Sequence, residues 1–342
     1  MNAGELVEVV LPGKVEPEGL RIRHGAVPAA GPGQVLVRME ATGVSFAEQQ
    51  MRRGRYYDQP PFPFVPGYDV VGTVVATGEG VDPGLAGVRV AALVKVGGWA
   101  SHVIVEAADV VEVPEGISAA EAETVVVNGI TAWQMLHRKA RVRAGQTVLV
   151  HGANGGVGSV LADLARAAGV RVIGTASPRH HDTLRRHGVV PVDYRDDVAA
   201  RVRELAPGGV DAVFDHVGGR GVVASWRLLA PGGTLVSYGS ASTRDDEGSK
   251  QWPVLKLLAR VWLWNALPNR RRAYFFNVWA GRALAKNAFR ARLRADLTQV
   301  FAALRRGDVT ARIAAELPLD RVADAMRLAE SGTVAGKIVL TP

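Results

Sequence analysis

The pattern of hydrophobic and polar positions changes once along this chain of 342 residues. Up to about residue 125, short runs rich in β-branched residues alternate with Gly and Pro turns, as at 34–38, 70–75 and 88–94. Short strands separated by turn residues in this rhythm predict an antiparallel, barrel-like β domain.

After Asn128 the pattern becomes strand, glycine turn and amphipathic helix in succession. That alternation is typical of βαβ units, which build a parallel sheet with helices on both faces. A segment at 250–282, rich in Trp, Tyr and Phe, then breaks the pattern. The predicted strands are 147–151, 171–174, 210–214, 235–238 (after a turn at 231–233) and 337–340, and the predicted helices lie near 156–168, 179–187 and 288–306.

Length and composition limit the classes of protein to which this chain can belong. At ~150 residues per domain, a chain of 342 residues is expected to form two domains. The chain has no cysteine, which excludes disulfides, thiolate catalysis and zinc sites built on Cys ligands. Residues 1–12 lack the pattern of a signal peptide, and no stretch approaches the ~20 apolar residues of a membrane span. We therefore expect a soluble, cytoplasmic protein.

Positive charge is concentrated in one part of the chain. The net charge is +8, yet residues 249–295 contain eleven Lys or Arg and no carboxylate, while the other residues carry 30 basic and 33 acidic groups. Leu255, Leu258, Val261 and Trp262 fall on one helical face of this stretch. Several interpretations stay open: a solvated face, a core or subunit interface, a lid over an apolar substrate, a membrane-surface helix, or a contact with an anionic partner.

A glycine-rich turn, HGANGGVG at 151–158, lies between a predicted strand and a predicted helix. Ala153, Gly155 and Gly158 occupy the three small-residue positions of the dinucleotide fingerprint. A side chain at Gly155 would block the approach of the backbone to a pyrophosphate, and one at Gly158 would separate helix from strand. A tight turn alone would also favour glycine, so the prediction depends on the strand-turn-helix context. The predicted phosphate-binding residues are Ala153, Asn154, Gly155, Gly156, Val157 and Gly158.

The end of the second predicted strand indicates which dinucleotide is bound. NAD-binding proteins place a carboxylate there on the ribose hydroxyls, whereas residues 174–181 (GTASPRHH) contain no acid. Ser177 can donate to a 2′-phosphate, and Arg179, beside His180, can clamp it with two hydrogen bonds. The sequence favours NADPH over NADH; the alternative is that Arg179 and His180 only begin a helix in solvent.

The order of motifs resembles the quinone oxidoreductase, or zeta-crystallin-like, group of the medium-chain dehydrogenase/reductase superfamily, and the resemblance covers essentially the whole chain. It implies a GroES-like β-barrel-type catalytic domain at 1–125 and 281–342, and a doubly wound Rossmann cofactor domain at 126–280. It also implies a homodimer formed by edge strands of the cofactor domain. The motifs are 41–48 (ATGVSFAE), 53–56 (RGRY), 66–72 (PGYDVVG), 128–133 (NGITAW), the glycine-rich turn, 215–219 (DHVGG) and 336–340 (GKIVL).

Zinc ligands of the zinc-dependent relatives are replaced in this chain. A Cys of those relatives lies near the position of Ser45, and a Gly-His-Glu stands where this chain has GYD at 67–69. Without a zinc Lewis acid, alcohol oxidation by the metal route is not expected. Hydride transfer to a quinone or an electron-poor alkene remains feasible, because the conjugated acceptor carries the developing negative charge.

The candidate catalytic residues are Ser45, Tyr56 and Tyr68. Ser45 stands where many members of the family carry an Asn near the nicotinamide. Tyr56, Tyr57, Tyr68 or a water molecule can supply the donor that the acceptor oxygen needs, although a packed core position is the alternative for Tyr68.

The resemblance also implies further cofactor contacts. Thr131 corresponds to a contact beside the nicotinamide, and Tyr194 to a tyrosine near the 2′-phosphate. Ser240 falls where loop backbone holds the nicotinamide amide. Lys337 approaches the phosphates, unless it is a surface lysine. The loop residues Val217, Tyr238 and Gly239 complete the predicted set.

Two rival functions follow from the same features. An enoyl-thioester reductase would use the basic stretch to meet the phosphates of an acyl-CoA or a carrier. An NADPH-binding protein that contacts RNA would use its basic and aromatic residues for stacking, but no RNA-binding module is present. His180, His181 and His216 lack the neighbouring ligands of a metal site, so we expect no metal, no nucleic-acid partner and a small apolar quinone or enone as substrate.

Overall fold

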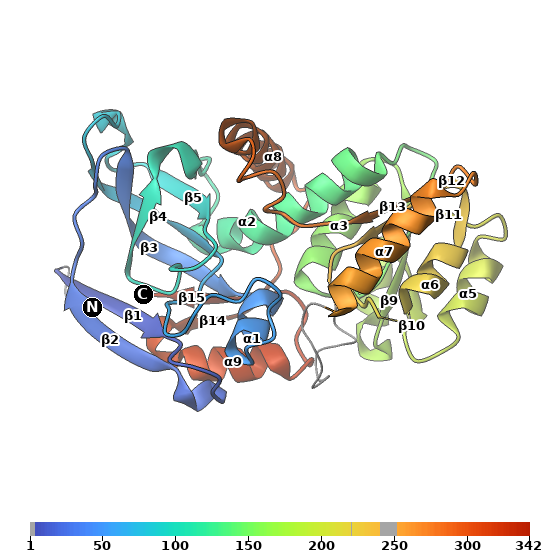
Figure 1. Ribbon diagram of the computed structural model, residues 1–342, viewed down its shortest axis with the longest axis horizontal. Coiled ribbons are helices and arrows are strands. Elements are labelled where there is room, and N and C mark those ends of the chain that lie inside the picture. The colour runs from blue at the N-terminus through green and yellow to red at the C-terminus, as the bar shows by residue number, and fades with distance from the viewer. Residues whose placement is uncertain (1–3, 220, 240–251) are drawn as a thin grey trace. The chain divides into compact units, whose positions relative to one another are not determined.

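The computed structural model describes residues 4–219, 221–239 and 252–342 (Figure 1). The chain divides into two compact units. The first unit comprises Met1–Ile130, Leu284–Gly307 and Ala311–Pro342, and the second comprises Thr131–Ala283 and Asp308–Thr310. The divisions lie a few residues from the positions expected at 125 and 281.

The first unit is built around a mostly antiparallel sheet. Its strand order is β14-β15-β3-β4-β5-β7, with β6 paired to β3, and only β14 and β15 run parallel to each other. A separate two-stranded ribbon pairs β1 (Glu5–Val10) with β2 (Arg21–Ala26). The strands of the main sheet are β3 (Gln34–Val44), β4 (Asp69–Thr77), β5 (Arg89–Leu93), β6 (His102–Glu106), β7 (Val110–Glu112), β14 (Ile313–Pro318) and β15 (Lys337–Thr341).

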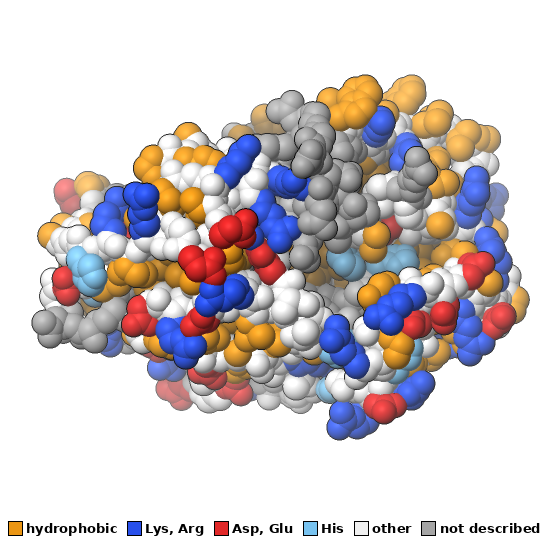
Figure 2. Space-filling view, turned by 90° about the horizontal axis from the view of Figure 1, so that it is seen from below, with side chains coloured by type: hydrophobic (Ala, Val, Ile, Leu, Met, Phe, Trp, Pro, Cys, Tyr) orange, Lys and Arg blue, Asp and Glu red, His pale blue; other side chains and the backbone are white. Residues whose placement is uncertain are grey.

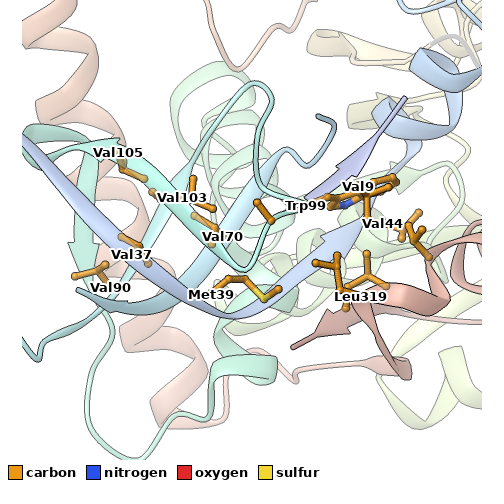
Figure 3. Close-up of a cluster of buried hydrophobic side chains, with 14 of the residues drawn as sticks. Val9, Val37, Met39, Val44, Val70, Val90, Trp99, Val103, Val105 and Leu319 are labelled. Carbon is orange, nitrogen blue, oxygen red and sulfur yellow. The ribbon is translucent and has the colours of Figure 1, made fainter. Parts of the chain in front are cut away.

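Strand alternation explains the core of this unit. Val35, Val37 and Met39 are alternate residues of β3, and all three are buried. Figure 3 shows Val37 and Met39 in one cluster with side chains of neighbouring strands and with Trp99. The indole N–H of Trp99 donates to the carbonyl oxygen of Gly43 at 2.9 Å, so this large buried side chain leaves no polar atom unpaired. Four helices belong wholly or partly to the unit: α1 (Phe46–Arg52), α2 (Ala119–Trp133), α8 (Lys286–Arg306) and α9 (Val322–Glu330).

The second unit is a doubly wound parallel sheet. Its strand order, β10-β9-β8-β11-β12-β13, is the 3-2-1-4-5-6 order in which the winding reverses between the first and fourth strands. The predicted α/β fold class is therefore confirmed. The strands are β8 (Thr147–Val150), β9 (Arg171–Ala176), β10 (Val189–Asp193), β11 (Val210–Asp215), β12 (Leu229–Ser237) and β13 (Arg272–Phe275), and the helices are α3 (Gly156–Ala167), α4 (His181–Arg186), α5 (Val198–Leu205), α6 (Gly221–Arg227) and α7 (Trp252–Ala266).

The structure differs from the sequence-based expectations mainly after residue 228. The segment that breaks the pattern contains a regular helix, α7, and the last strand of the sheet, β13. The expected turn at 231–233 lies within β12, where the pairing with β11 shifts register. Among the described residues, no helix has both the length and the apolar composition that crossing a membrane requires.

Candidate functional site

The glycine-rich turn lies at the topological switch point of the second unit. It follows β8 and leads into α3. The backbone N–H of His151 donates to Phe214 on β11 at 3.0 Å, and that of Ala153 donates to Thr175 on β9 at 3.0 Å. The turn is thus held by the strands on both sides of β8. Ligands of doubly wound sheets bind at this position, at the carboxyl ends of the strands.

The glycines of the turn fit the approach of a phosphate group. A Cβ on Gly158 would lie 2.2 Å from the carbonyl oxygen of Gly152, so a side chain there would force the turn away from α3. A Cβ on Gly155 would meet only that same oxygen, at 3.3 Å, and the space around Gly155 is otherwise open. Among the residues that the structure describes, no side chain caps the N-terminus of α3 at Gly155 or competes there with an anion for the first N–H groups.

A buried polar network supports the turn from beneath. The ring Nδ1 of His216 lies 3.1 Å from the carbonyl oxygen of His151, and the ring Nε2 of His151 lies 3.1 Å from the Ser225 hydroxyl. Ser225 donates to Asp215 at 2.7 Å. Burial lowers the pKa of both histidines, which keeps them neutral near pH 7. This network therefore holds the turn without placing a positive charge under it.

Asp215 also shapes the loop after β11. Its Oδ1 accepts the backbone N–H groups of Val217 and Gly218 at 2.8 and 2.9 Å, and its backbone carbonyl accepts the N–H of Tyr238 at 2.9 Å. Val217 and Tyr238, both predicted cofactor residues, are thereby brought to the same edge of the sheet. The sequence analysis did not single out His151, Asp215 or Ser225 as site residues. The available signal was that His151 and Asp215 each stand at the carboxyl end of a strand.

Of the remaining predicted cofactor residues, the structure describes Gly239 and Thr131. Gly239 lies against the backbone of His216, where a Cβ would come within 2.7 Å of the carbonyl oxygen. Thr131 is buried in α2. Ser240 lies outside the described residues.

The predicted 2′-phosphate residues gather at the ends of β9 and β10. The N–H of Tyr194, just after β10, donates to Ala176 at the end of β9 at 3.4 Å. Ser177, Arg179 and His180 follow Ala176 directly, and Arg179 and Tyr194 are exposed. These predicted side chains therefore lie at the ends of two neighbouring strands.

Arg195 is a basic residue of this region that the sequence analysis did not consider. Its guanidinium lies 5.4 Å from the centre of the Tyr194 ring, in a cation–π arrangement. Asp193 is the nearby acid, and its Oδ1 accepts the backbone N–H of Arg195 at 3.1 Å. The edge thus offers a second cation to a phosphate.

In the first unit, Ser45 is the N-cap of α1. Its hydroxyl accepts the N–H of Ala47 at 3.2 Å, while the Glu48 carboxylate accepts the N–H of Ser45 at 2.9 Å and also pairs with its hydroxyl. This is a capping box, in which two side chains satisfy the free N–H groups of the first turn. The Ser45 side chain is therefore fixed relative to α1.

Two of the candidate tyrosines form a buried pair. The hydroxyls of Tyr56 and Tyr68 lie 2.8 Å apart, and both side chains are buried. Tyr57 packs on Tyr56 with ring centres 4.7 Å apart and is itself partly exposed. Burial, and then the neighbouring Tyr68, raise the pKa of the Tyr56 phenol, which therefore stays protonated and able to donate.

Lys337 lies in a different environment from the one expected. Its ammonium is buried, 3.0 Å from a carboxylate oxygen of Glu123 and 3.3 Å from one of Asp69. Glu48, Asp69 and Glu123 are also buried, and burial raises the pKa of Glu48 and of Glu123. We call Glu48, Asp69, Glu123 and Lys337 the carboxylate cluster. The expectation that Lys337 meets cofactor phosphates is corrected, because its ammonium already pairs with buried carboxylates.

Within residues 4–219, 221–239 and 252–342, no group of three or more His, Asp or Glu side chains is arranged to hold a metal ion.

Comparison with known proteins places this geometry among oxidoreductases. The family model of the alcohol dehydrogenase GroES-like domain matches residues 31–115, and that of zinc-binding dehydrogenase matches residues 187–340. The synaptic vesicle membrane protein VAT-1 homolog of Rattus norvegicus is 36% identical over 338 residues, which are 94% of this chain and 80% of the relative.

Solved structures are similar over the full length of both chains. A quinone oxidoreductase of Pseudomonas syringae has a TM-score of 0.84 and 27% identity, covering 98% of this chain and 100% of its own. A mycobacterial protein solved in complex with NADPH has a TM-score of 0.82 and 28% identity, with the same coverage.

Proposed function

This chain belongs to the medium-chain dehydrogenase/reductase superfamily, in its quinone oxidoreductase group, and from that membership we propose that it is an NADPH-dependent reductase. The proposed reaction is hydride transfer, without zinc, to a small apolar quinone or an α,β-unsaturated carbonyl. The observation that carries the proposal is the open glycine turn at the switch point of the second unit, held by strands on both sides.

Bound NADPH supplies a hydride from its nicotinamide ring. The protein chain itself binds and orients the NADPH. Backbone N–H groups at 156–158 would hold the pyrophosphate, and Ser177, Arg179 and Tyr194 would hold the 2′-phosphate. Thr131, Val217 and the backbone of Tyr238 and Gly239 orient the nicotinamide.

Tyr56 and Tyr68 are the proposed polar groups for the acceptor. As hydride adds, negative charge develops on the acceptor oxygen, and a preorganised donor stabilises that charge. The Tyr56–Tyr68 pair fits this role because the Tyr56 phenol keeps its proton and its hydroxyl lies 2.8 Å from that of Tyr68. A phenol that keeps its proton stabilises the oxyanion by hydrogen bonding, and solvent completes the protonation.

We expect Tyr56→Phe and Tyr68→Phe each to lower kcat about tenfold or more, because loss of one oxyanion donor typically costs 10²–10³ in rate. The measurement is the initial rate of NADPH oxidation with a quinone and with an enone. Tyr274→Phe is the matched control, since Tyr274 lies on β13 and is not one of the candidate donors. Unchanged kcat in both pair variants, with normal folding, would assign the donor to water or another residue.

Arg179→Ala is expected to raise the Kd for NADPH about tenfold and to leave the Kd for NADH unchanged, because only NADPH carries the phosphate that a guanidinium clamps. Fluorescence titration with both nucleotides measures this. Arg185→Ala is the control, since Arg185 lies on α4 nearby and pairs with Asp182 instead. Equal weakening of both nucleotides by Arg179→Ala would contradict the assignment.

The whole proposal is tested by titrating the protein with NADPH and NADH and then following NADPH oxidation with quinones, free enones and an enoyl-CoA. Tight NADPH binding with turnover of quinones or enones is the expected result. A preference for the enoyl-CoA would indicate that the acceptor is a thioester and not a quinone or a free enone. Absence of NADPH binding would overturn the proposal.

We further propose a homodimer that forms through β13, the end strand of the second unit's sheet. Among the described residues, no strand pairs with its outer edge. Unpaired strand edges are the usual place where a second copy adds to a sheet. Light scattering coupled to gel filtration tests this directly, because a monomer would contradict it.

A further inference from the structure

Glu48 is a buried carboxyl group to which the proposed reaction assigns no part. Its side chain on α1 is 1% exposed, and its Oε1 has no hydrogen-bond partner among the described residues. At the surface of the protein, acidic and basic side chains lie next to each other in water, as Figure 2 shows. Glu48 lies instead in the carboxylate cluster with Asp69, Glu123 and Lys337, where water does not stabilise a charge.

The carboxylate cluster contains one cation for three carboxyl groups. The Lys337 ammonium lies 3.0 Å from a Glu123 oxygen and 3.3 Å from an Asp69 oxygen. Asp69 Oδ2 also accepts the backbone N–H of Val127 at 3.2 Å. In the described part of the chain, the ion pairs of this ammonium are with Glu123 and Asp69 and not with Glu48. Because an unpaired buried charge is costly, Glu48 keeps its proton.

A second Ser-x-x-Glu capping box in the chain shows what capping alone requires. At the start of α2, the Glu121 carboxylate accepts the backbone N–H of Ser118 at 2.9 Å and the Ser118 hydroxyl at 2.8 Å. Ser118 is exposed and Glu121 is half-buried, whereas Glu48 is buried among other carboxyl groups. The need for a helix cap therefore does not explain the burial of Glu48.

The hydroxyl of Ser45 connects Glu48 to the surface of the first unit. Ser45 is partly exposed, and its oxygen accepts the backbone N–H of Ala47 at 3.2 Å. A hydroxyl group has two lone pairs and one hydrogen. A protonated Glu48 donates to the second lone pair, so the Ser45 hydrogen is left for a partner outside the protein. An ionised Glu48 accepts that hydrogen instead, so the Ser45 hydroxyl then has nothing to donate.

We propose that Glu48 stores the proton of the reduction and passes it to the acceptor through the Ser45 hydroxyl. The proposal rests on the reductase function proposed above. Once a hydride from NADPH has added to the quinone or enone, the acceptor anion takes the Ser45 hydrogen, and the Ser45 oxygen takes the proton of Glu48. Glu48 is then a carboxylate, and a proton from solvent returns along the same path before the next turnover. The acceptor has gained one hydride and one proton, and the protein is unchanged.

The oxyanion donors and this proton path lie in the same part of the first unit. Tyr68, of the Tyr56–Tyr68 pair, directly precedes Asp69 of the carboxylate cluster in the chain. The two groups would have different roles. A phenol donates a hydrogen bond to the acceptor oxygen and keeps its proton, while Glu48, acting through Ser45, gives its proton away.

The proposal predicts how kcat depends on pH. The titratable groups packed with Glu48 are Asp69 on β4, Glu123 on α2 and Lys337 on β15. Burial raises the pKa of Glu48, although the Ser45 hydroxyl and the Lys337 charge act in the opposite direction. Burial lowers the pKa of Lys337, but the carboxyl groups around it raise that pKa by more, so its charge stays constant near neutral pH. We therefore expect kcat to be highest at acidic pH and to decline as Glu48 ionises.

The first test compares the pH profile of kcat for the full chain and its variants with a quinone and with an enone. General acid catalysis typically contributes about 10²–10⁴-fold, and solvent can replace part of it. Glu48→Gln and Ser45→Ala should therefore lower kcat about tenfold or more, leave the KM for the acceptor unchanged and remove the decline with pH. Ser45→Thr keeps a hydroxyl and should keep the profile. Glu121→Gln and Ser118→Ala are the matched controls, because they remove the same groups from the exposed capping box.

The second test is infrared spectroscopy of the protein without NADPH, which does not depend on turnover. At neutral pH we expect the carbonyl band of a protonated carboxyl group, which Glu48→Gln removes and Ser45→Ala shifts. A spectrum that Glu48→Gln leaves unchanged would overturn the proposal, because Glu48 would then be ionised. A pH profile that Glu48→Gln leaves unchanged, or an equal loss of kcat in the two control variants, would also overturn it and leave the reductase function intact. Absence of NADPH oxidation in the parent protein, with the band present, would overturn the reductase function and the proton path together.

Discussion

Gly155→Ala is expected to weaken NADPH binding about tenfold to a hundredfold while the protein keeps its melting temperature. The added Cβ meets only the Gly152 carbonyl oxygen, at 3.3 Å, so the turn itself needs little adjustment. The methyl group instead occupies the side from which a pyrophosphate must approach the backbone. A lost hydrogen bond to a charged group costs about 1.5–3 kcal/mol, which corresponds to that range of affinity. Isothermal titration with NADPH measures the effect.

Gly158→Ala is the matched comparison for Gly155→Ala, because the same methyl group has a different effect there. Its Cβ would lie 2.2 Å from the Gly152 carbonyl oxygen and 3.0 Å from the carbonyl carbon, which are backbone atoms that cannot rotate away. We expect a lower melting temperature together with weaker binding. If Gly155→Ala bound NADPH as tightly as the parent protein, the turn would not be the phosphate site.

Lys337→Met is expected to lower the free energy of unfolding by about 3–5 kcal/mol, the usual cost of removing one partner from a buried ion pair. Glu123 and Asp69 are fully buried, and in the described part of the chain both have oxygens that receive no hydrogen bond apart from the Lys337 ion pairs. Without the ammonium, the carboxylates must stay charged and unpaired or take up protons. Urea unfolding followed by circular dichroism measures the loss.

The pH dependence of stability provides the control for Lys337→Met. Burial raises the pKa of Glu48 and Glu123 from their ordinary value of 4.5, so the folded state binds more protons than the unfolded state above that pH. Their contribution is present at acidic pH and is lost as pH rises through the folded-state pKa. Glu123→Gln should therefore flatten the decline in stability as pH rises above 4.5. A steeper decline in this variant would contradict the assignment.

Local features of the sequence were sufficient for the cofactor half of the candidate site. The glycine turn, the acid-free stretch at 174–181 and the strands around them are each specified by residues within one βαβ unit. Hydrophobic periodicity and glycine conformation act over a few residues, so they can be interpreted without knowing the fold. Tyr194, which the family resemblance implied, lies next to Ala176 because β9 and β10 pair with each other and are neighbours along the chain.

The carboxylate cluster and the exposed side of α7 were decided only by the tertiary structure. Lys337 lies 268 residues from Asp69 along the chain and meets it because β15 pairs with β3, with Ile338 opposite Val44. A lysine in GKIVL is compatible with a surface, a phosphate or a carboxylate, and its partner depends on which strands become neighbours. In α7, the sequence grouped Val261 with Leu255, Leu258 and Trp262, whereas the fold packs the partly buried Val261 against the core and exposes the other three. Periodicity thus identified the helix, and packing against the sheet decided which of its apolar faces stays outside, because both faces are hydrophobic enough to be the buried one.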